Sequence, residues 1–482
     1  MAASWGEITA QEMLSPLRGT LVLGRRTSIL SGISTDSRKI KPGELFWALR
    51  GEFHDGHDFA LRALEGGAAG LVVQKEWWRS KADSLSSGFA LSDSYIRSPV
   101  VIVVDDTLEA LGDLAGWWRR RHDVLVSVIT GSAGKTTTKE MAAGILELRN
   151  RVLKNRGNLN NLIGLPVTLL RMEKRCEVAA LEMGTNRFGE IARLTEIADP
   201  DVGVITNVGM AHLEGFGDLE GVARAKLELV DKISLKGKVV LNGDDEFLMK
   251  MASPYTREVV TFGIGKKSDV RADQIRDLGR KGVSFRLGFP GGSLAVKLKV
   301  PGLQNVSNAL AAASVAFCLN EPPEYIAEGL GLFAGIGGRF AMTRLPGDVV
   351  LVDDTYNANP LALRAALVSV KSLVREGSRI IVGLGEMTEL GDATVLEHRE
   401  AGRRVAELGA HFLLAVGAHA HELVKGAVDA GMRRDQAEVV TSHDEMTNRI
   451  REEAKGGDLI FLKGSRKIGL ERVVEGLKAR LN

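Results

Sequence analysis

The residues best suited to chemistry form one glycine-rich segment, residues 131–138, Gly-Ser-Ala-Gly-Lys-Thr-Thr-Thr, which follows the apolar run VLVSVIT. Glycines let backbone N–H groups curl around an oxyanion, and the N-terminus of a helix that follows adds positive partial charge. There, Lys135 can reach the β- and γ-phosphates of a nucleotide, and the Thr136 hydroxyl can ligate Mg²⁺. The alternative is an ordinary glycine-containing turn. Because Gly-Lys-Thr-Thr stands between a strand and a helix, we predict a phosphate-binding loop.

The spacing of the two glycines departs from the common form of such a loop. That form has a glycine, four arbitrary residues and then Gly-Lys followed by Ser or Thr. Here Ile129 stands five residues before Gly134, and the nearest upstream glycine, Gly131, is only three residues before it. The segment is therefore a damaged copy, a coincidence or a different type of phosphate-binding loop.

Two further polar side chains follow apolar runs in the same part of the chain. Glu182 ends the run in AALEMGTN, and His212 follows the run in ITNVGMAHLEGFG. A carboxylate at the end of a strand can hold the Mg²⁺ that Thr136 also contacts, although alone it is more often a solvated loop acid. A lone histidine is usually structural, but this one lies among glycines that leave room for a ligand. Since ligands of open α/β sheets bind at the carboxyl ends of the strands, we expect one site there.

The elements that must position these residues are parallel strands alternating with helices. Residues 124–336 contain VLVSVIT, CEVAALEMG, DVGVITNVG and GKVVLNGDD, and residues 337–482 contain DVVLVDDTYN, SRIIVGLGEM, HFLLAVG, AEVVTS and DLIFLKGS. Continuous apolar runs of this kind are typical of buried strands in a mostly parallel sheet. Residues 107–123 have helical apolar spacing and a basic end. We predict an α/β protein with a small N-terminal domain (1–106), a connecting helix (107–123), a central P-loop-like domain (124–336) and a C-terminal Rossmann-like domain (337–482).

The composition is that of a soluble globular protein, with 44% hydrophobic and 26% charged residues. With 63 Lys and Arg against 61 Asp and Glu, the net charge of +2 gives no indication of nucleic-acid or anionic-membrane binding. Cys176 and Cys318 lack the spacing of a disulfide framework or a metal site, which predicts reduced thiols. The N-terminus lacks a basic start followed by an apolar stretch, and no run of 18 apolar residues occurs. We expect a cytoplasmic monomer without membrane insertion.

Motifs along nearly the whole chain resemble one family. The loop TGSAGKTT is similar to that of the Mur ligases and the related folylpolyglutamate synthases, ATP-dependent enzymes whose two loop glycines are closely spaced. The resemblance continues through NRGNLNNLIGLP, LEMGTNRFGEI, TNVGMAHLEGFGDLEGVARAK, PGLQNVSNALAAA, GGRF, VDDTYNANP, GEMTELG and KGSRKIGLERVV. Together these motifs resemble the Mur ligase branch that adds D-alanyl-D-alanine to a UDP-N-acetylmuramoyl-tripeptide. The branch that adds diaminopimelate or lysine would carry an Asn-Pro-Arg motif in the third block, and this sequence has none.

The resemblance implies roles for residues of the central and C-terminal blocks. Lys226 matches the family lysine that becomes carbamylated and then presents carboxylate-like oxygens to a cation, whereas the sequence alone favours an exposed helix lysine. Tyr356 stands where some members carry a phosphate-directed lysine, which puts that contact in doubt. The expected catalytic residues are Lys135, Glu182, His212, Lys226 and Arg339, of which Glu182, His212 and Lys226, with Thr136, would serve two Mg²⁺ sites. The expected ATP-binding residues are Gly131, Ser132, Ala133, Gly134, Lys135, Thr136, Thr137, Asn305, Asn308, Arg339 and Asp354, with the asparagines facing the adenine region, Arg339 the γ-phosphate and Asp354 the ribose.

The N-terminal segment STDSRKIKPGELFWALRGEFHDGHDF resembles the uridine-nucleotide-binding domain shared by the two branches. Thr35, Ser37 and Arg38 would contact the nucleotide and Asp36 would orient them, while Asn160 and Asn161 would face the muramoyl peptide. The stretch GSRK at 464–467 would help to receive the dipeptide. The expected substrate-binding residues are Thr35, Asp36, Ser37, Arg38, Asn160, Asn161, Tyr356, Asn357, Ser465 and Arg466.

The resemblance implies an ATP-dependent ligase of peptidoglycan precursor synthesis that works through an acyl phosphate. Two alternatives remain. A folylpolyglutamate synthase would share the central and C-terminal blocks but would lack a nucleotide-binding domain of about 100 residues in front of them. A nucleotide-dependent switch or motor would use the loop for hydrolysis only and would not need the paired asparagines, Lys226 or the N-terminal TDSR motif.

Overall fold

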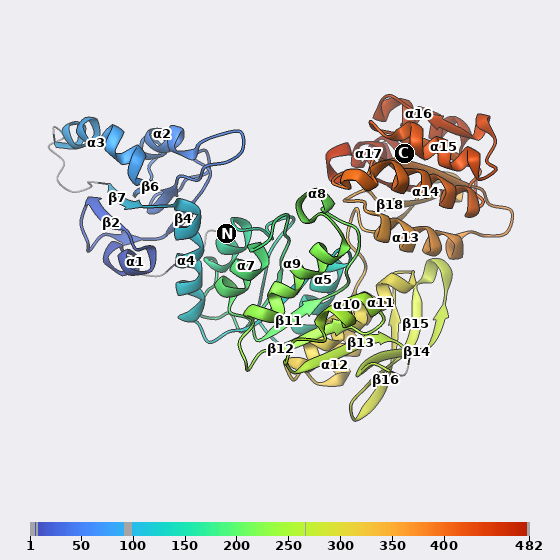
Figure 1. The fold of residues 1–482 in the computed structure, drawn as a ribbon, viewed down its shortest axis with the longest axis horizontal. Coiled ribbons are helices and arrows are strands. Elements are labelled where there is room, and N and C mark those ends of the chain that lie inside the picture. The colour runs from blue at the N-terminus through green and yellow to red at the C-terminus, as the bar shows by residue number, and fades with distance from the viewer. Residues whose placement is uncertain (1–4, 6–7, 91–98, 266, 480–482) are drawn as a thin grey trace.

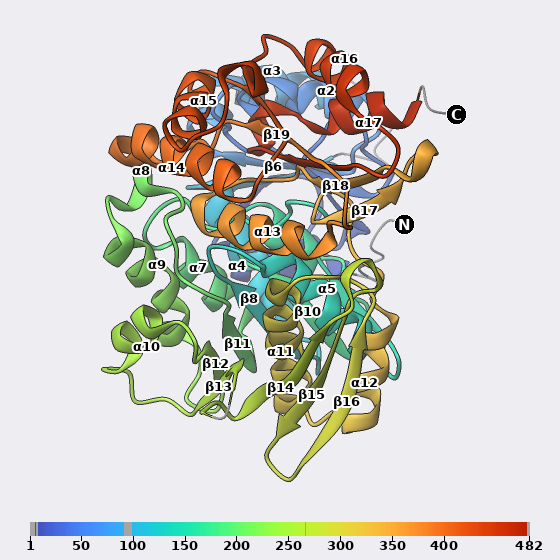
Figure 2. The same cartoon turned by 90° about the vertical axis from the view of Figure 1, so that its right-hand side faces the viewer.

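The computed structural model describes residue 5 and residues 8–90, 99–265 and 267–479, and it contains three main β-sheets in chain order (Figures 1 and 2). The predicted α/β fold class is confirmed. Figure 1 shows the N-terminal and C-terminal sheets on two sides of the central one, with α8 (Leu213–Phe216) at the edge of the central domain between them. Because each range contains one main sheet, we propose domains at 1–106, 124–336 and 337–482. Within the described residues, none of the helices has both the length and the apolar character needed to cross a membrane.

The N-terminal domain has a mostly parallel five-stranded sheet in the order β2-β7-β6-β5-β4, with β2 antiparallel, and a separate antiparallel pair, β1-β3. The apolar runs GELFWAL (43–49) and AAGLVV (68–73) supply β5 and most of β6. Its elements are β1 (Ile8–Thr9), α1 (Ala10–Leu17), β2 (Thr20–Leu23), β3 (Ile29–Leu30), β4 (Gly32–Ser34), β5 (Glu44–Trp47), η1 (Gly56–Phe59), α2 (Ala60–Glu65), β6 (Gly70–Gln74), α3 (Lys75–Ala90) and β7 (Val100–Val104).

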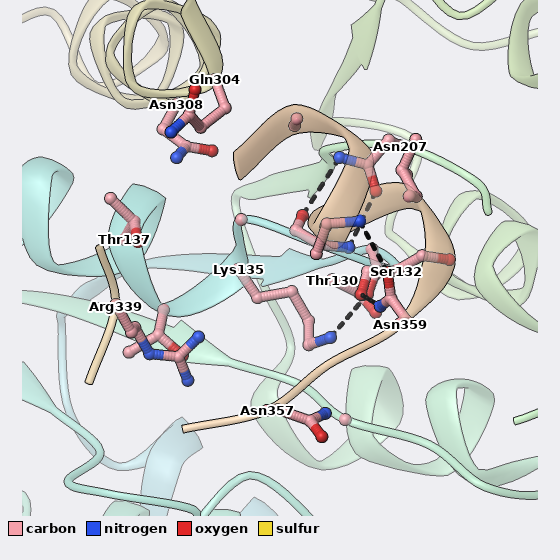
Figure 3. A pocket seen from close by; sticks show the side chains of 18 of the residues that line it. Thr130, Ser132, Lys135, Thr137, Asn207, Gln304, Asn308, Arg339, Asn357 and Asn359 are labelled. Carbon is pink, nitrogen blue, oxygen red and sulfur yellow. Dashed lines mark hydrogen bonds between the residues drawn. The ribbon is translucent and has the colours of Figure 1, made fainter. Parts of the chain in front are cut away.

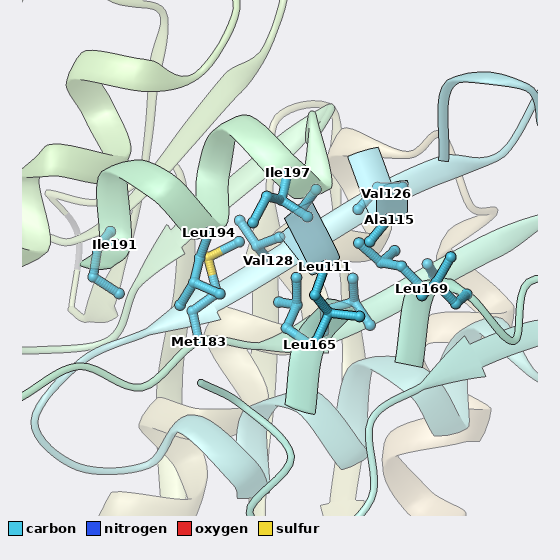
Figure 4. Close-up of a cluster of buried hydrophobic side chains, with 14 of the residues drawn as sticks. Leu111, Ala115, Val126, Val128, Leu165, Leu169, Met183, Ile191, Leu194 and Ile197 are labelled. Carbon is cyan, nitrogen blue, oxygen red and sulfur yellow. The ribbon is translucent and has the colours of Figure 1, made fainter. Parts of the chain in front are cut away.

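The helix expected at 107–123 is α4 (Thr107–Arg120), which begins at a side-chain cap, since Asp106 accepts from the N–H groups of Leu108 and Glu109. Its apolar face, including Leu111 and Ala115, packs against side chains of the central domain (Figure 4). The other residues of this buried cluster that Figure 4 labels are Val126, Val128, Leu165, Leu169, Met183, Ile191, Leu194 and Ile197. One continuous core therefore joins the N-terminal domain to the central one.

The central domain has a nine-stranded sheet in the order β16-β15-β14-β13-β12-β11-β8-β10-β9. Strands β9 to β14 and β8 pair in parallel, whereas β15 and β16 add antiparallel hairpins at one edge. Its elements are β8 (Leu125–Thr130), α5 (Lys135–Leu146), β9 (Val152–Lys154), α6 (Gly164–Leu169), β10 (Val178–Glu182), α7 (Glu190–Ala198), β11 (Val202–Ile205), α8, α9 (Leu219–Lys232), β12 (Lys238–Asn242), α10 (Glu246–Ala252), β13 (Val259–Ile264), β14 (Val270–Asp277), η2 (Gly279–Lys281), β15 (Val283–Phe289), β16 (Gly292–Leu298), α11 (Leu303–Cys318) and α12 (Pro323–Leu332). Because β8 lies between β10 and β11, its carboxyl end is a topological switch point, where ligands of such sheets bind.

The C-terminal domain has a six-stranded sheet in the order β17-β18-β22-β19-β20-β21, parallel except for β17. All five apolar runs predicted in this block form strands. The elements are β17 (Ala341–Arg344), η3 (Pro346–Asp348), β18 (Val350–Asp354), α13 (Pro360–Leu373), β19 (Ile380–Gly385), η4 (Gly391–Ala393), α14 (Thr394–Glu407), β20 (Phe412–Val416), α15 (Ala420–Asp429), η5 (Arg434–Gln436), β21 (Ala437–Val439), α16 (His443–Glu453), β22 (Leu459–Lys463), η6 (Arg466–Ile468) and α17 (Glu471–Ala479).

Candidate functional site

The predicted phosphate loop connects β8 to α5, and Lys135 already belongs to the first turn of the helix. Gly134 precedes the helix with φ 82° and no side-chain cap, which leaves first-turn N–H groups for another acceptor. A Cβ atom at Gly131, where φ is 147°, would lie 1.9 Å from Thr206 Oγ1, and one at Gly134 would lie 2.3 Å from Asn308 Oδ1. Any side chain larger than hydrogen would therefore clash at both positions. The two closely spaced glycines thus form an intact loop and not a damaged copy of the common one.

The end of β11 holds the loop in place. Asn207 Oδ1 accepts from the N–H of Ala133 at 2.8 Å, and Asn207 Nδ2 donates to the carbonyl of the same residue at 3.1 Å (Figure 3). Thr206 Oγ1 donates to that carbonyl at 2.6 Å, and Ser132 Oγ donates to the carbonyl of Gly209 at 3.0 Å. The loop is thus preorganised by side chains from a neighbouring strand. Asn207 was not predicted, although its place directly after an apolar run is the same signal that identified Glu182.

The Thr136 hydroxyl and the Glu182 carboxylate, which are expected to hold a metal ion, are hydrogen-bonded to each other. Thr136 Oγ1 donates to Glu182 Oε2 at 2.6 Å, and Asn160 Nδ2 donates to Glu182 Oε1 at 2.8 Å. Asn155 fixes the backbone of Glu182, since its side chain donates to the carbonyl at 2.8 Å and accepts from the N–H at 2.9 Å. A hydroxyl and a buried carboxylate are thereby held as neighbouring oxygen donors, the type of ligand that Mg²⁺ prefers.

Lys135 interacts electrostatically with two other cations that line the same cavity, Lys226 and Arg339. Lys135 Nζ donates to the carbonyl of Gly131 at 2.6 Å. Burial lowers the pKa of the Lys135 ammonium; the Glu182 carboxylate opposes this shift, and the Arg339 guanidinium adds to it. Burial also lowers the pKa of Lys226 to about 7, and the nearby Lys135 ammonium acts in the same direction. The positive charge that gathers around Lys135 favours an anionic ligand at the phosphate loop.

Lys226 lies on α9 with only 2% of its surface exposed, so that the alternative of an exposed helix lysine is wrong. Within the described residues, no carboxylate forms an ion pair with it, and its lowered pKa makes the neutral amine accessible near neutral pH. The chain therefore places a reactive amine against the phosphate loop.

His212 joins the central domain to the C-terminal one. It precedes α8 in the left-handed conformation, with φ 56°, and its Nδ1 contacts the carboxylate of Glu389, in the loop that follows β19. The His212 imidazole lowers the pKa of Glu389. Glu389 was not predicted, because the sequence carries no signal for a contact between residues that lie in separate sheets.

The C-terminal domain adds a second group of polar residues, centred on Asp354 at the end of β18. Phe340 N–H donates to Asp354 Oδ1 at 3.0 Å, and the buried Lys463, at the end of β22, donates to Oδ2. Lys463 also donates to the carbonyl of Asn357 at 3.0 Å. Burial raises the pKa of the Asp354 carboxyl, and the Lys463 ammonium opposes that shift. Lys463 was also not predicted; it favours the charged form of Asp354, whereas burial favours the neutral form.

The paired asparagines lie on α11, which packs against α5. Asn308 Oδ1 accepts from Thr138 Oγ1 at 3.4 Å, and Asn308 Nδ2 donates to Asn305 Oδ1 at 3.3 Å. Asn305 Nδ2 donates in turn to the carbonyl of Pro301 at 2.8 Å. This chain of amides connects the first turn of α5 to the start of α11.

Together these elements line one cavity of about 930 Å³ between the central and C-terminal domains. Figure 3 shows Lys135, Arg339 and Asn357 among the side chains that line it, with Asn308 and Gln304 contributed by α11. The predicted residues that line the cavity are Gly131, Ser132, Ala133, Gly134, Lys135, Thr136, Thr137, Asn160, Asn161, Glu182, His212, Lys226, Asn305, Asn308, Arg339, Asp354, Tyr356 and Asn357.

Six predicted residues do not line this cavity. Ser465 is buried, and its hydroxyl accepts from the N–H of Thr388 at 3.0 Å; Arg466 lies next to it at the start of η6. The segment formed by Thr35, Asp36, Ser37 and Arg38 lies in the N-terminal domain, after β4.

Within that N-terminal segment, Asp36 Oδ1 accepts from Arg38 Nε at 2.8 Å and Oδ2 from Nη2 at 3.0 Å. The Arg38 guanidinium lowers the pKa of Asp36 to about 2. Arg38 keeps 75% of its side chain exposed. Asp36 therefore orients Arg38, whose exposed guanidinium can contact a ligand.

The chain matches models of three domains of one family. Residues 29–118 match the Mur ligase family catalytic domain, residues 129–316 match the Mur ligase middle domain, and residues 338–466 match the Mur ligase glutamate ligase domain. The three matches coincide with the three main sheets.

Individual relatives are similar over nearly the full length. The UDP-N-acetylmuramoyl-tripeptide--D-alanyl-D-alanine ligase of Bacillus subtilis is 33% identical over 470 residues, which are 97% of this chain and 98% of the relative. A crystal structure of MurF from Acinetobacter baumannii has a TM-score of 0.86 and 32% identity and covers 98% of this chain and 99% of its own. The MurF ligase from Thermotoga maritima, solved in complex with ADP, has a TM-score of 0.79 and 27% identity and covers 93% of this chain and 97% of its own.

Proposed function

The chain belongs to the Mur ligase family, and on this premise we propose that it joins D-alanyl-D-alanine to a UDP-N-acetylmuramoyl-tripeptide with the use of ATP. The product would be the pentapeptide precursor of peptidoglycan. The observation that carries the proposal is one cavity in which the phosphate loop and the Thr136–Glu182 pair of the central domain face Arg339 of the C-terminal domain. In support, a relative with the D-alanyl-D-alanine ligase name is 33% identical over 97% of this chain, which includes residues of all three proposed domains.

The first step is the activation of a carboxylate. The terminal carboxylate of the tripeptide attacks the γ-phosphorus of ATP, which forms an acyl phosphate and releases ADP. Negative charge shifts from the attacking oxygen to the leaving β-phosphate, and Lys135 together with the first-turn N–H groups of α5 would stabilise it from one side of the cavity. Arg339 would stabilise the transferred group from the C-terminal side.

The second step forms the amide bond. The free amine of D-alanyl-D-alanine attacks the acyl carbon, a tetrahedral intermediate forms, and inorganic phosphate leaves as the bond to its oxygen breaks. The proton that the amine loses passes to the departing phosphate. Water would hydrolyse the acyl phosphate, so that closure of the two domains over the bound substrates would protect it.

The residues present fit Mg²⁺ at the phosphate loop. Thr136 and Glu182 offer a hydroxyl and a carboxylate, and the described residues contain no group of three or more His, Cys, Asp and Glu side chains that could hold a metal. This is the donor set of an ion shared with substrate phosphates, since Mg²⁺ is commonly bound by one or two carboxylates and completed by phosphate and water. When bound, the ion would supply Lewis-acid neutralisation of the phosphate charge.

We infer that Lys226 acts as a carbamate at a second cation site with His212. A neutral lysine amine adds CO₂ and loses a proton, which replaces an ammonium by a group with two oxygen donors. The burial of Lys226, its lowered pKa and its place in the cavity support this assignment. The unmodified ammonium would only add to the positive charge of Lys135.

We assign the uridine nucleotide to the N-terminal domain, where Thr35, Ser37 and the oriented Arg38 would bind it. Asn161 Oδ1 accepts from the N–H of Gly164, the first residue of α6, at 2.8 Å. Together with Asn160, Asn161 would contact the muramoyl-peptide part of the substrate. We further infer a cytoplasmic location, since ATP and a nucleotide-linked precursor are two of the three substrates. We also propose a monomer, and light scattering would test this oligomeric state.

The experiment that tests the function is a product assay. The protein is incubated with ATP, the UDP-tripeptide and D-alanyl-D-alanine, and the product mass and the release of ADP and phosphate are measured. We expect release only when both the UDP-tripeptide and the dipeptide are present, because the acyl phosphate turns over when the amine arrives. Equal ATP hydrolysis without either substrate would support the switch or motor alternative. Activity with a folate and glutamate in place of these substrates would support the folylpolyglutamate synthase alternative.

A further inference from the structure

Helix α13 of the C-terminal domain contacts the central domain at several points along its length. At its start, the Asn359 side chain donates to the carbonyl of Ser132 in the phosphate loop. In its second half, the buried Ser369 donates from Oγ to Gln304 Oε1, at the start of α11, at 2.5 Å. Figures 1 and 2 show α13 on the side of the C-terminal domain that faces the β14–β15 hairpin. The helix is therefore an element through which the C-terminal domain rests on the central one.

The contact at the end of α13 comes from Arg280, in the turn η2 between β14 and β15. Arg280 Nε donates to the carbonyl of Leu373, the last residue of the helix, at 3.2 Å. A helix leaves its last carbonyls without partners and carries negative partial charge there, so that a guanidinium is a suitable partner. The turn is fixed by Gly279, which has φ 58° and whose N–H donates to Asp277 Oδ1 at 2.7 Å. The hairpin thus presents Arg280 to the helix at a defined place.

Two arginines of the C-terminal domain lie near Arg280, and both are paired with Asp348. Arg344 Nε lies 2.8 Å from Asp348 Oδ1, and Arg375 Nη1 lies 2.7 Å from Oδ2. Burial lowers the pKa of Arg280, and the Arg375 guanidinium adds to this shift. Within the described part of the chain, no carboxylate forms an ion pair with Arg280. The end of α13 is therefore the polar partner that holds this guanidinium among like charges.

The start of α13 follows directly the segment that carries several cavity residues of the C-terminal domain. Asp354 ends β18, Tyr356 and Asn357 come next, and Asn359 caps the helix. The 14 residues of α13 span about 21 Å at a rise of about 1.5 Å per residue. A stiff helix that is held at one end can still turn about that end, whereas a second contact one helix length away fixes its direction. The Arg280 contact therefore controls how the cavity segment is oriented.

We propose that Arg280 is a positioning residue of the ligase reaction. Through the end of α13, it sets the orientation in which Asp354 and Arg339 meet the nucleotide at the phosphate loop. This inference rests on the proposed function, in which these residues and the loop act on the same ATP. Arg280 does not line the cavity, so that its effect passes through the helix. An outer hairpin of the central sheet thereby contributes to catalysis without a contact to substrate.

The experiment measures the steady-state kinetics of four full-length proteins with ATP, the UDP-tripeptide and D-alanyl-D-alanine. They are the wild type, Arg280→Met, Arg280→Lys and the control Lys281→Met. Methionine keeps an apolar stem but has no donor, whereas lysine keeps the charge and can donate to one carbonyl. Lys281 is the matched control, since it is an exposed cation of the same turn that has no side-chain hydrogen bond or ion pair among the described residues.

We expect Arg280→Met to raise the KM for ATP and to lower kcat. The loss in kcat/KM for ATP should be about 10- to 100-fold, since a misplacement of about 1 Å can cost about 100-fold in rate. Arg280→Lys should recover part of this loss, and Lys281→Met should keep the wild-type values. The affinity for the UDP-tripeptide without ATP, measured by calorimetry, should be the same in all four proteins, because the N-terminal domain would bind it.

A double-mutant cycle with Asn359→Ser tests whether the two contacts act on one helix. If α13 must be held at both ends, the loss of either contact already frees its orientation. The loss in kcat/KM of the double variant should then be smaller than the product of the two single losses. Lys281→Met combined with Asn359→Ser should show only the loss of Asn359→Ser.

Wild-type kinetics in a folded Arg280→Met would overturn the proposal, even if its melting temperature were lower, because the role would then be structural only. A double variant whose loss equals the product of the single losses would also overturn it. If Arg280→Met does not fold, as judged by circular dichroism, Arg280→Lys replaces it and must show a raised KM for ATP. If the wild type makes no product with D-alanyl-D-alanine, the proposed function itself fails, which is a different result. The positioning by Arg280 is then judged on the affinity for ADP, which should still fall in Arg280→Met.

Discussion

The side-chain amide of Asn359 connects the C-terminal domain to the phosphate loop, since its Nδ2 donates to the carbonyl oxygen of Ser132 at 3.1 Å (Figure 3). The same side chain begins α13, because its Oδ1 accepts from the N–H of Ala362 at 2.8 Å. One residue thus couples the start of a helix in one domain to the geometry of a loop in another. Its neighbour in the sequence, Pro360, is the first residue of that helix.

The two roles of Asn359 are separable by substitution. Asn359→Ser keeps a capping oxygen but is too short to donate to Ser132, so we expect near wild-type stability and a raised KM for ATP. Asn359→Ala removes both contacts and should also lower the free energy of unfolding by about 1 kcal/mol, the typical value of a helix cap. Urea unfolding and steady-state kinetics measure the two effects. Wild-type kinetics in Asn359→Ser would show that the contact between domains has no role in nucleotide binding.

Lys135→Ala and Glu182→Ala should lose activity by two orders of magnitude or more while both variants stay folded. Lys135→Ala removes a cation beside the transferred phosphoryl group, where one stabilising donor is worth roughly 3–4 kcal/mol. Glu182→Ala removes a carboxylate that would hold Mg²⁺ at the same group. Product formation measures the loss, and circular dichroism checks the fold. More than about a tenth of wild-type activity, equivalent to about 1.4 kcal/mol, would rule out the assigned role.

Arg38→Ala should raise the KM for the UDP-tripeptide and leave the KM for ATP nearly unchanged, because the two ligands would lie on different domains. Lys39→Ala is the matched control, since Lys39 is a neighbouring exposed cation that is only 3.8 Å from the same carboxylate of Asp36. A parallel rise of both KM values in Arg38→Ala would contradict the assignment of the uridine nucleotide to this domain.

Lys226→Ala should be nearly inactive and should recover partly when acetate or formate is added, because a small carboxylate can occupy the vacated space and restore oxygen donors. Lys226→Arg should remain inactive under the same treatment, since its side chain fills the space and keeps a positive charge. Initial rates with and without the additive measure the recovery. An active Lys226→Ala without additive would end the carbamate hypothesis.

The stability of the unmodified protein should also depend on pH through Lys226. The folded pKa of about 7 lies below the value of about 10.4 for an unfolded lysine. Between these values the unfolded state binds the proton and the folded state does not, so stability increases with pH across this window. Below pH 7 both states are protonated, and the full penalty of a buried ammonium remains. Urea unfolding in CO₂-free buffer at pH 6.5 and 9 should show this rise in the wild type relative to Lys226→Met; equal slopes would contradict it.

Much of the architecture could be predicted from local patterns. Apolar runs such as VLVSVIT and CEVAALEMG form strands because continuous apolar side chains need burial on both faces of a sheet. Glu182 could be identified for the same reason, since it is the polar residue that ends such a run. The phosphate loop was also a local signal, because the glycines and the lysine act through the backbone geometry of one short segment.

Other features depend on which strands become neighbours. The positions of β10 and β11 on either side of β8 bring Glu182 and Asn207 to the same loop, and no local pattern contains this order. The burial of Lys226 could not be predicted either, since the apolar pattern of an amphipathic helix does not show how deeply one of its lysines lies in the folded protein.

By itself, the sequence determined the α/β class, the strand-forming runs, the phosphate loop and the family resemblance, because each is carried by residues close together in the chain. Only the tertiary structure decided the contacts of Asn359 with Ser132, of His212 with Glu389 and of Lys463 with Asp354. The members of each pair lie far apart in the chain, and two of the pairs join different domains. Their proximity results from the packing of whole sheets and domains, whose contacts stabilise the folded chain together. No local sequence pattern records which distant residues this packing brings into contact.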